Sequence, residues 1–304
     1  MQQHHDGHAK EQHLVLVGAC YMDTILSVPH FPEEDSKLRA TSLSVRRGGN
    51  CPNSLEVLQQ LLRSSAGISS GSNSDDKAAA ATPAFSGLQA GRGTRIQAHL
   101  VSPLPGRASA ATAQIKSSFG ARQGPDGIDF SRCLYREGHE APASSYVLRS
   151  AATGSRTVVN HNDLPDMTVE EFTAVVESLQ ADEAERDQGR PRQWWWHFEG
   201  RVPDTTLECM RVLRRAYGRG NDGCSSSSDR PGDDNALRIS VEVEKPGRQG
   251  LRELAAEADV VFYSRSWAEV SDRRASDAAR HLLQLTGGMQ VGAIQRRGRG
   301  AGRE

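Results

Sequence analysis

The sequence predicts an α/β fold in which helices flank a mostly parallel sheet in three layers, with a small separate β-sheet attached. Two patterns support this prediction. Short apolar runs rich in β-branched residues alternate with amphipathic stretches of helical period, which is typical of parallel sheets covered by helices. Two further segments interrupt this alternation with a strand-like pattern, so they are expected to pair outside the main sheet.

The alternation begins with an apolar strand at residues 14–18, followed by a helix in which the leucines of residues 55–62 form one stripe. Three consecutive tryptophans at residues 194–196 fall in a later strand. Alternate side chains of a strand face opposite layers, so burial in the core explains two of the three. The remaining strand–helix pairs are residues 96–101 with 108–119, 194–198 with 204–217, 237–243 with 248–256, and 259–264 with 272–285.

Two segments depart from this order. Residues 37–47 alternate in strand fashion, and residues 146–148 and 156–160 flank a turn at 152–155, which favours a hairpin. We expect these segments to form a small β-sheet lid, within about 24–47 and 143–162. Such a lid, placed over the carboxyl ends of the main strands, would exclude water from a reacting group.

The composition limits the size of the ordered core. Of the 304 residues, 37% are hydrophobic, and the 29 glycines are concentrated in stretches rich in Ser, Gly and Ala that bury too little apolar surface to order themselves. We expect one domain over residues 14–294, between a polar tail at 1–13 and a basic tail at 295–304. Surface insertions are expected at 64–94, 182–192 and 218–235.

The net charge and the cysteines restrict the classes of binding partner and the cellular compartment that we expect. A formal net charge of -1 gives no global attraction to nucleic acid or to an anionic membrane, which favours small-molecule partners. The five cysteines are scattered, odd in number and free of any C-x-x-C pair, as expected in a reducing compartment. The apolar run that follows the polar N-terminus is too short for a membrane span, so we expect a cytoplasmic protein.

Residues 47–53, Arg-Gly-Gly-Asn-Cys-Pro-Asn, predict a strand-to-helix corner that binds a polyol. The paired glycines let the backbone approach a ligand closely, and Pro52 suits the first turn of the following helix. Asn50 and Asn53 are three residues apart, so their amides point the same way on a helical first turn. Each amide can both donate to and accept from a hydroxyl, as recognition of a sugar requires.

With this corner, several further motifs resemble the PfkB/ribokinase-like family of carbohydrate kinases, and within it the ketohexokinase (fructokinase) branch. The resemblance extends over residues 14–294 and implies a ribokinase-like fold. The motifs occur in the family's order at residues 18–25, 32–36, 47–54, 154–157, 163–166, 197–201, 240–246 and 259–262.

The resemblance implies two groups of site residues. Asp23 would accept hydrogen bonds from two adjacent sugar hydroxyls, and Gly49, Asn50 and Asn53 would complete the sugar site. The residues near the nucleotide phosphates would be Arg156, Glu199 and Lys245. Ordinary structural roles are the alternatives: a loop carboxylate for Asp23, a solvated strand arginine for Arg156, and strand-end charges for the other two. ATP and Mg²⁺ are implied as cofactors, and a homodimer through the lid as an assembly.

One part of the family pattern is absent. In relatives, a Gly-Ala-Gly-Asp turn opens a helix whose backbone N–H groups hold the transferring phosphate, and its aspartate takes the proton from the acceptor hydroxyl. No such segment occurs among these 304 residues, and residues 299–303 place Arg303 where the aspartate would stand. We therefore expect no catalytic residue here, a domain truncated at its C-terminal end, and an inactive chain.

The function predicted from the family is transfer of the ATP γ-phosphate to a primary hydroxyl of a ketohexose, converting fructose to fructose 1-phosphate. Two alternatives stay open. The chain could be a non-catalytic sugar-binding fragment or pseudokinase, or it could belong to a kinase of another acceptor, such as ribose or a nucleoside. The sugar site by itself does not specify the size of the ring.

Overall fold

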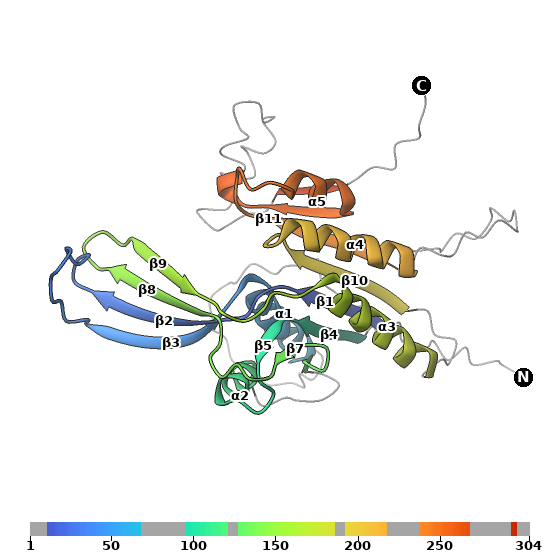
Figure 1. Ribbon diagram of the computed structural model, residues 1–304, viewed down its shortest axis with the longest axis horizontal. Coiled ribbons are helices and arrows are strands. Elements are labelled where there is room, and N and C mark those ends of the chain that lie inside the picture. The colour runs from blue at the N-terminus through green and yellow to red at the C-terminus, as the bar shows by residue number, and fades with distance from the viewer. Residues whose placement is uncertain are drawn as a thin grey trace, which may run out of the picture.

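The computed structural model describes residues 11–67, 95–120, 127–185, 192–217, 237–267 and 293–296. Within these ranges the chain forms a main sheet with helices on both faces, and a second sheet that projects from one end of the first (Figure 1). This arrangement confirms the predicted α/β fold with its mostly parallel sheet and small separate sheet. No helix in the described part of the chain is both long and apolar enough to span a membrane.

The main sheet is parallel except at one edge. Its strands, in spatial order, are β13 (Ala293–Arg296), β12 (Val260–Tyr263), β11 (Leu237–Val243), β10 (Arg192–Glu199), β1 (Glu11–Val17), β4 (Arg95–Val101) and β6 (Ile128–Asp129). Only β13 runs antiparallel to its neighbour β12. Both faces of β1 are covered, since Val15 and Val17 belong to the core on one face and Leu16 to the core on the other, so its buried part is apolar on both sides.

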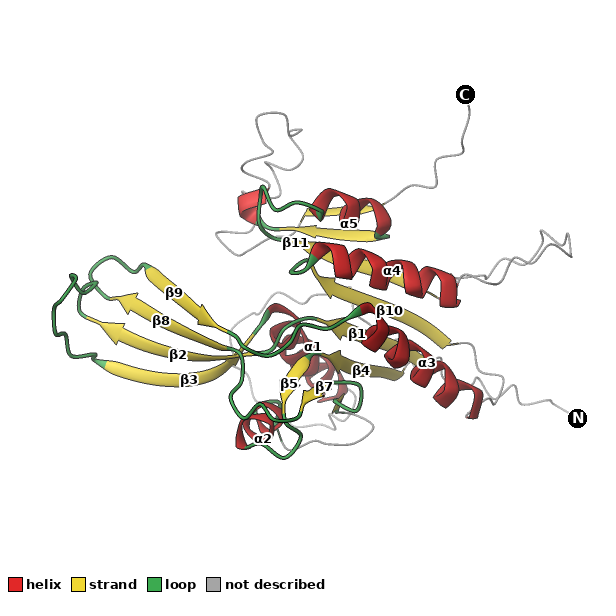
Figure 2. Ribbon diagram, in the orientation of Figure 1, coloured by secondary structure: helices red, strands yellow, loops and turns green. Residues whose placement is uncertain are grey.

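Helices cover the two faces unequally (Figure 2). One face packs against three helices through fully buried side chains that include Phe172, Met210 and Leu254, with Trp196 from the sheet. On the other face, Leu55 packs with Leu16 of the sheet. Each such side chain contributes about 1.5–3 kcal/mol by leaving water. The helices of the first face are α3 (Val169–Glu185), α4 (Pro203–Tyr217) and α5 (Leu251–Glu257), and those on the side of Leu55 are α1 (Asn50–Gly67) and α2 (Ala110–Ser117).

The second sheet is the predicted lid. Its strands, in spatial order, are β3 (Ser42–Gly48), β2 (Tyr21–Val28), β8 (Ser144–Ser150) and β9 (Arg156–His161). β8 and β9 form the predicted hairpin, whose turn contains Gly154 at φ +69°. The strands β5 (Pro103–Pro105) and β7 (Leu134–Arg136) form a separate two-stranded sheet beside α2.

Several expected boundaries differ from the structure. β1 begins at Glu11 instead of residue 14, and β3 begins at Ser42 instead of residue 37. α1 and α3 extend to Gly67 and Glu185, so the first residues of two expected insertions are helical. β13 crosses the expected boundary at residue 294. The helix expected at residues 272–285 lies outside the described residues.

Helix α3 has no counterpart among the predicted elements, although the sequence contains a signal for it. Thr168 and Glu171 form a capping box, in which the Glu171 N–H donates to the Thr168 hydroxyl (3.2 Å) and the Thr168 N–H donates to the Glu171 carboxylate (3.0 Å). A Thr-x-x-Glu sequence before an apolar run therefore marks the start of this helix.

Candidate functional site

The candidate site lies at the carboxyl ends of the central strands, where open parallel sheets bind ligands. Val17 of β1 is level with Phe198 of β10, and Glu199 is level with Glu242 of β11. The chain leaves β1 at this edge, enters the lid through β2, and returns through the β3–α1 corner. The ends of six elements, β1, β2, β3, α1, β10 and β11, therefore lie at this edge of the sheet.

The two positions of the β3–α1 corner that carry glycine require it for different steric reasons. A Cβ atom on Gly48 would lie 2.5 Å from Oδ2 of Asp23, so only glycine leaves room for that carboxylate. Gly49 has φ +103°, and a Cβ atom there would lie 2.2 Å from the carbonyl oxygen of Ala19. The corner thus brings its backbone against Asp23 and Ala19, and through them fixes the position of α1.

Asp23 lies on β2 with its side chain 17% exposed. Its cross-strand neighbour on β3 is Arg46, whose Nε is 3.9 Å from Oδ2 of Asp23. Arg46 is itself 67% exposed, so this ion pair is weak. Asp23 is therefore a partly buried carboxylate beside Gly48 that can accept hydrogen bonds from a ligand.

The side-chain amides of Asn50 and Asn53 each form a hydrogen bond within the protein through one of their two polar atoms. Nδ2 of Asn50 donates to Oε2 of Glu242 at 2.9 Å. Oδ1 of Asn53 accepts from Nη1 of Arg47 at 3.2 Å. The sequence predicted that both amides would donate and accept alike, whereas in the structure Asn50 leaves its carbonyl oxygen, and Asn53 its amino group, for a ligand.

Two carboxylates at the strand ends are held in a low-polarity environment. Burial raises the pKa of Glu199, whose Oε2 accepts a hydrogen bond from the Ala19 N–H at 2.8 Å. Burial also raises the pKa of Glu242 to about 7; the hydrogen bond from Asn50 opposes this shift, and the negative charges of Glu199 and Glu244 increase it.

A hollow of about 400 Å³ opens beside Glu242 on the face of the sheet that carries α1. Its volume falls within the range of small-molecule sites. His197 lines it, with Nδ1 2.9 Å from Oγ of Ser240, and burial lowers the pKa of this imidazole to about 4, so it is neutral at physiological pH. The other residues around the hollow include Ser54, Trp195, Glu244 and Phe262.

The predicted phosphate-binding residues are not all brought together. Glu199 lies at the site, and Lys245 is exposed just beyond the end of β11. Arg156 is exposed at the start of β9, four positions from Asn160, the residue level with Asp23 across the lid. At about 3.3 Å per residue, Arg156 is roughly 13 Å further along the lid.

Two residues of the site were not selected from the sequence. Arg47 holds Asn53, and Glu242 holds Asn50. Both lie within motifs that carry the family resemblance, Arg47 in residues 47–54 and Glu242 in residues 240–246. Glu242 also lies near the carboxyl end of a strand that the sequence predicted. Their partners become visible only in the folded chain, because Asn50 and Glu242 are 192 residues apart.

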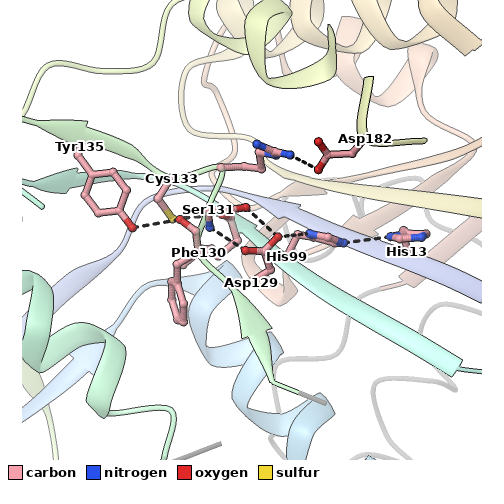
Figure 3. A network of polar contacts seen from close by, with 10 residues as sticks. His13, His99, Asp129, Phe130, Ser131, Cys133, Tyr135 and Asp182 are labelled. Carbon is pink, nitrogen blue, oxygen red and sulfur yellow. Dashed lines mark hydrogen bonds and ion pairs between the residues drawn. The ribbon is translucent and has the colours of Figure 1, made fainter. Parts of the chain in front are cut away.

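A second polar network lies across the strands β1, β4 and β6, away from this site (Figure 3). Nδ1 of His13 is 3.1 Å from Nε2 of His99, and Nδ1 of His99 is 3.0 Å from Oδ2 of Asp129. Burial favours a higher pKa for Asp129, but hydrogen bonds from His99 and Ser131 outweigh it, and the pKa lies below its usual range. Nothing in the sequence pattern predicted this cluster.

The network borders a hollow of about 850 Å³. Within the described residues, no three His, Cys, Asp or Glu side chains are grouped so that they could hold a metal ion.

Comparisons with known proteins agree with this fold. No family model matches the chain. Over 261 residues the chain is 26% identical to ketohexokinase from Mus musculus, a match that covers 86% of this chain and 66% of the mouse protein. The fold is shared with ribokinase from Giardia lamblia, at a TM-score of 0.53 and 14% identity over 90% of this chain and 64% of that one. A carbohydrate kinase from Agrobacterium tumefaciens gives a TM-score of 0.52 and 12% identity over 91% and 67%.

The mostly parallel sheet with its projecting β-sheet lid is a ribokinase-like fold. In sequence the chain resembles ketohexokinase, and in fold it resembles the ribokinase-like carbohydrate kinases. It spans about two thirds of the length of the mouse relative.

Proposed function

We propose that this chain carries the sugar-binding part of an ATP-dependent sugar kinase whose acceptor is a ketohexose such as fructose. The reaction of the kinase would transfer the γ-phosphate of ATP to a primary hydroxyl and yield fructose 1-phosphate. The observation that supports this proposal is that the Asp23 carboxylate lies against Gly48, next to the helix start that carries Asn50 and Asn53, each with one amide atom bonded within the protein.

These three side chains divide the work of holding a polyol. Asp23 accepts hydrogen bonds from adjacent hydroxyls, and the carbonyl oxygen of Asn50 accepts another. The amino group of Asn53 donates to a hydroxyl oxygen. Gly49 keeps the backbone of the corner close enough to Ala19 for α1 to present both amides. The lid carries Asp23 and would shield the bound sugar from water.

The proposed cofactors are ATP and Mg²⁺, as the family resemblance implies, and the cation would be held chiefly through the phosphate oxygens of ATP. Mg²⁺ would neutralise charge on the phosphate oxygens. Lys245 and Arg156 are the proposed cationic contacts to the nucleotide phosphates.

We propose further that these 304 residues bind the sugar without transferring phosphate. The reason is chemical, since the Gly-Ala-Gly-Asp segment that would supply the anion-binding N–H groups and the general base is not among them. A cytoplasmic location is part of the same proposal. Cys20, Cys51, Cys133 and Cys209 are free and buried, which fits a reducing compartment.

The test is calorimetric titration of the purified chain with fructose, in parallel with the Asp23→Asn variant. Loss of a charged acceptor costs about 1.5–3 kcal/mol, so we expect binding that weakens about tenfold to a hundredfold in the variant. Glu34→Gln, an exposed carboxylate between the lid strands β2 and β3, serves as the matched control and should bind like the wild type.

Three outcomes discriminate the alternatives. Tighter binding of ribose or of a nucleoside than of fructose would move the acceptor to that class. Fructose-dependent formation of ADP well above the Asp23→Asn background would overturn the proposal that the chain is inactive. No binding of any of these ligands would overturn the sugar site itself.

A further inference from the structure

Arg47 is a buried cation at the centre of the β3–α1 corner. Its side chain is only 2% exposed, and its guanidinium stacks on the ring of Phe119 at 4.0 Å. Nε donates to the Ser118 hydroxyl at 3.1 Å, Nη1 donates to Oδ1 of Asn53 at 3.2 Å, and Nη2 pairs with Glu56. Arg47 therefore joins the end of β3 to the first turns of α1 and to the end of α2.

The chemistry of this contact fixes the orientation of Asn53. A guanidinium has only N–H donors and stays protonated, so the atom of Asn53 that faces it has to be the oxygen. The amide cannot flip without placing its own N–H groups against those of Arg47, whose guanidinium is buried although Asn53 itself is exposed. A flip would leave a buried N–H donor of Arg47 without its acceptor, which costs about 1–3 kcal/mol.

We infer that Arg47 is a positioning residue that makes Asn53 a donor-only group toward the sugar. This inference rests on the proposed sugar site, and it adds that Asn53 only donates to the sugar whereas Asn50 only accepts from it. Asn53 serves a sugar oxygen whose proton is directed elsewhere, whereas the carbonyl of Asn50 receives a hydroxyl proton. The site therefore fixes the direction of two hydrogen bonds, in which one sugar oxygen accepts from Asn53 and another sugar hydroxyl donates to Asn50.

The Arg47–Asn53 contact can be tested without any sugar. A double-mutant cycle of Arg47→Lys and Asn53→Ala, followed by urea unfolding, measures whether the two side chains interact in the free protein. Lysine cannot reproduce the three-way donor geometry of arginine, so we expect each single variant to be less stable and the pair to be non-additive. Additive effects would overturn the contact.

Two variants then test the effect on binding. Asn53→Asp keeps an oxygen toward Arg47 and hence the fold, but presents a second oxygen where the sugar needs a donor. We expect fructose affinity to fall at least about tenfold while the melting temperature stays at or above the wild-type value. Unchanged affinity in this variant would overturn the donor-only role.

Arg47→Lys is measured at a temperature where it is fully folded, with Ser118→Ala as its matched control. Ser118 contacts Arg47 on the side of α2, away from Asn53, so its loss lowers stability without freeing the amide. We expect about tenfold weaker fructose binding in Arg47→Lys and a change within about twofold in Ser118→Ala. Equal losses in both would show that Arg47 acts on stability alone and overturn the inference.

The outcomes also separate this inference from the proposed function. A wild-type chain that binds no fructose, yet shows non-additivity in the unfolding cycle, would overturn the sugar site while keeping the Arg47–Asn53 contact. A wild-type chain that binds fructose, with the same affinity in Asn53→Asp and Arg47→Lys, would keep the sugar site and overturn the donor-only role of Asn53.

Discussion

At the β3–α1 corner, the residue type at a single position is decided by the group that packs against its backbone. Gly48 and Gly49 are both glycine for steric reasons, but the first makes room for a side chain and the second for a carbonyl oxygen. Pairs of glycines in a sequence indicate a close approach. They do not indicate which group approaches, because Asp23 and Ala19 come from segments more than 20 residues earlier.

The first prediction concerns Gly49→Ala, with Gly154→Ala as its matched control. Both glycines have positive φ, but a Cβ atom on Gly154 meets nothing within 4 Å, whereas one on Gly49 meets the Ala19 oxygen. We expect Gly154→Ala to lower the free energy of unfolding by about 1–2 kcal/mol, the penalty for a residue with a Cβ atom at positive φ. Gly49→Ala should lower it clearly more. Urea unfolding of both variants checks this, and equal losses would contradict the steric argument.

At the scale of elements, parallel pairing is what brings carboxylates together. Glu199 and Glu242 each end a strand, and the register between β10 and β11 places them level with each other. Neither strand alone explains the raised pKa of Glu242, since burial by the neighbouring elements and the charge of Glu199 both contribute. The site's electrostatics thus belong to the pair of strands.

The second prediction is a pH dependence of stability. The pKa of Glu242 is about 7 in the folded chain against an ordinary 4.5, so between these values the unfolded chain has released a proton that the folded chain still holds. Stability therefore falls as pH rises through this window, by on the order of 3 kcal/mol from this one group. Glu242→Gln removes this contribution and still lets Asn50 donate to a side-chain oxygen.

The pH dependence has to be measured in both the wild type and Glu242→Gln, because His197 changes stability with pH in the opposite direction. Its pKa is lowered to about 4 from 6.5, so its contribution to stability rises with pH between these values. The His197 contribution is common to wild type and variant and cancels in their difference. We expect that difference, measured by urea unfolding at pH 4 and pH 8, to shift in favour of the variant at pH 8. A constant difference would contradict the assignment.

Helix α1 shows where a periodic pattern overstates burial. Leu55 is fully buried and Leu58 partly buried, but Leu61 is 50% exposed. The leucine stripe correctly predicts the helix and the face that its first turns bury. Further along α1, within the described part of the chain, the apolar stripe is partly exposed to solvent at Leu61.

At the scale of the whole molecule, the lid has two different faces. Val45, Tyr146 and Val159 are cross-strand neighbours of Thr24 or of each other, so they share one face, and each is at least 49% exposed. Asp23 and Arg46 belong to the opposite face. Exposed apolar rows of this kind are typical of interaction surfaces. They support the proposal that two copies pair through their lids.

The third prediction tests this assembly. Val159→Lys places a charge on the apolar face, and Val158→Lys places the same charge one position away on the other face. In sedimentation analysis we expect the wild type and Val158→Lys to be dimers and Val159→Lys to shift toward monomer. A monomeric wild type, or equal dissociation in both variants, would contradict pairing through this face.

Much of the architecture follows from patterns in the chain. The apolar runs predicted the parallel strands, and the turn at residues 152–155 predicted the β8–β9 hairpin, because period and turn chemistry act over a few residues. Helix α3 was missed although its capping box is local. The His13–His99–Asp129 network could not be predicted, since its members lie on three strands that are adjacent only in the folded sheet.

The sequence by itself determined the class of fold, the position of the Gly-Gly-Asn corner and the chemical kinds of side chain that a polyol requires. Only the tertiary structure decided how those side chains are oriented. Asn50 and Asn53 are the same residue type on the same helical turn, yet they face Glu242 and Arg47 and so leave opposite polarities free. The physical reason is that an amide is symmetric in shape but not in hydrogen bonding, and its partners are chosen by long-range packing.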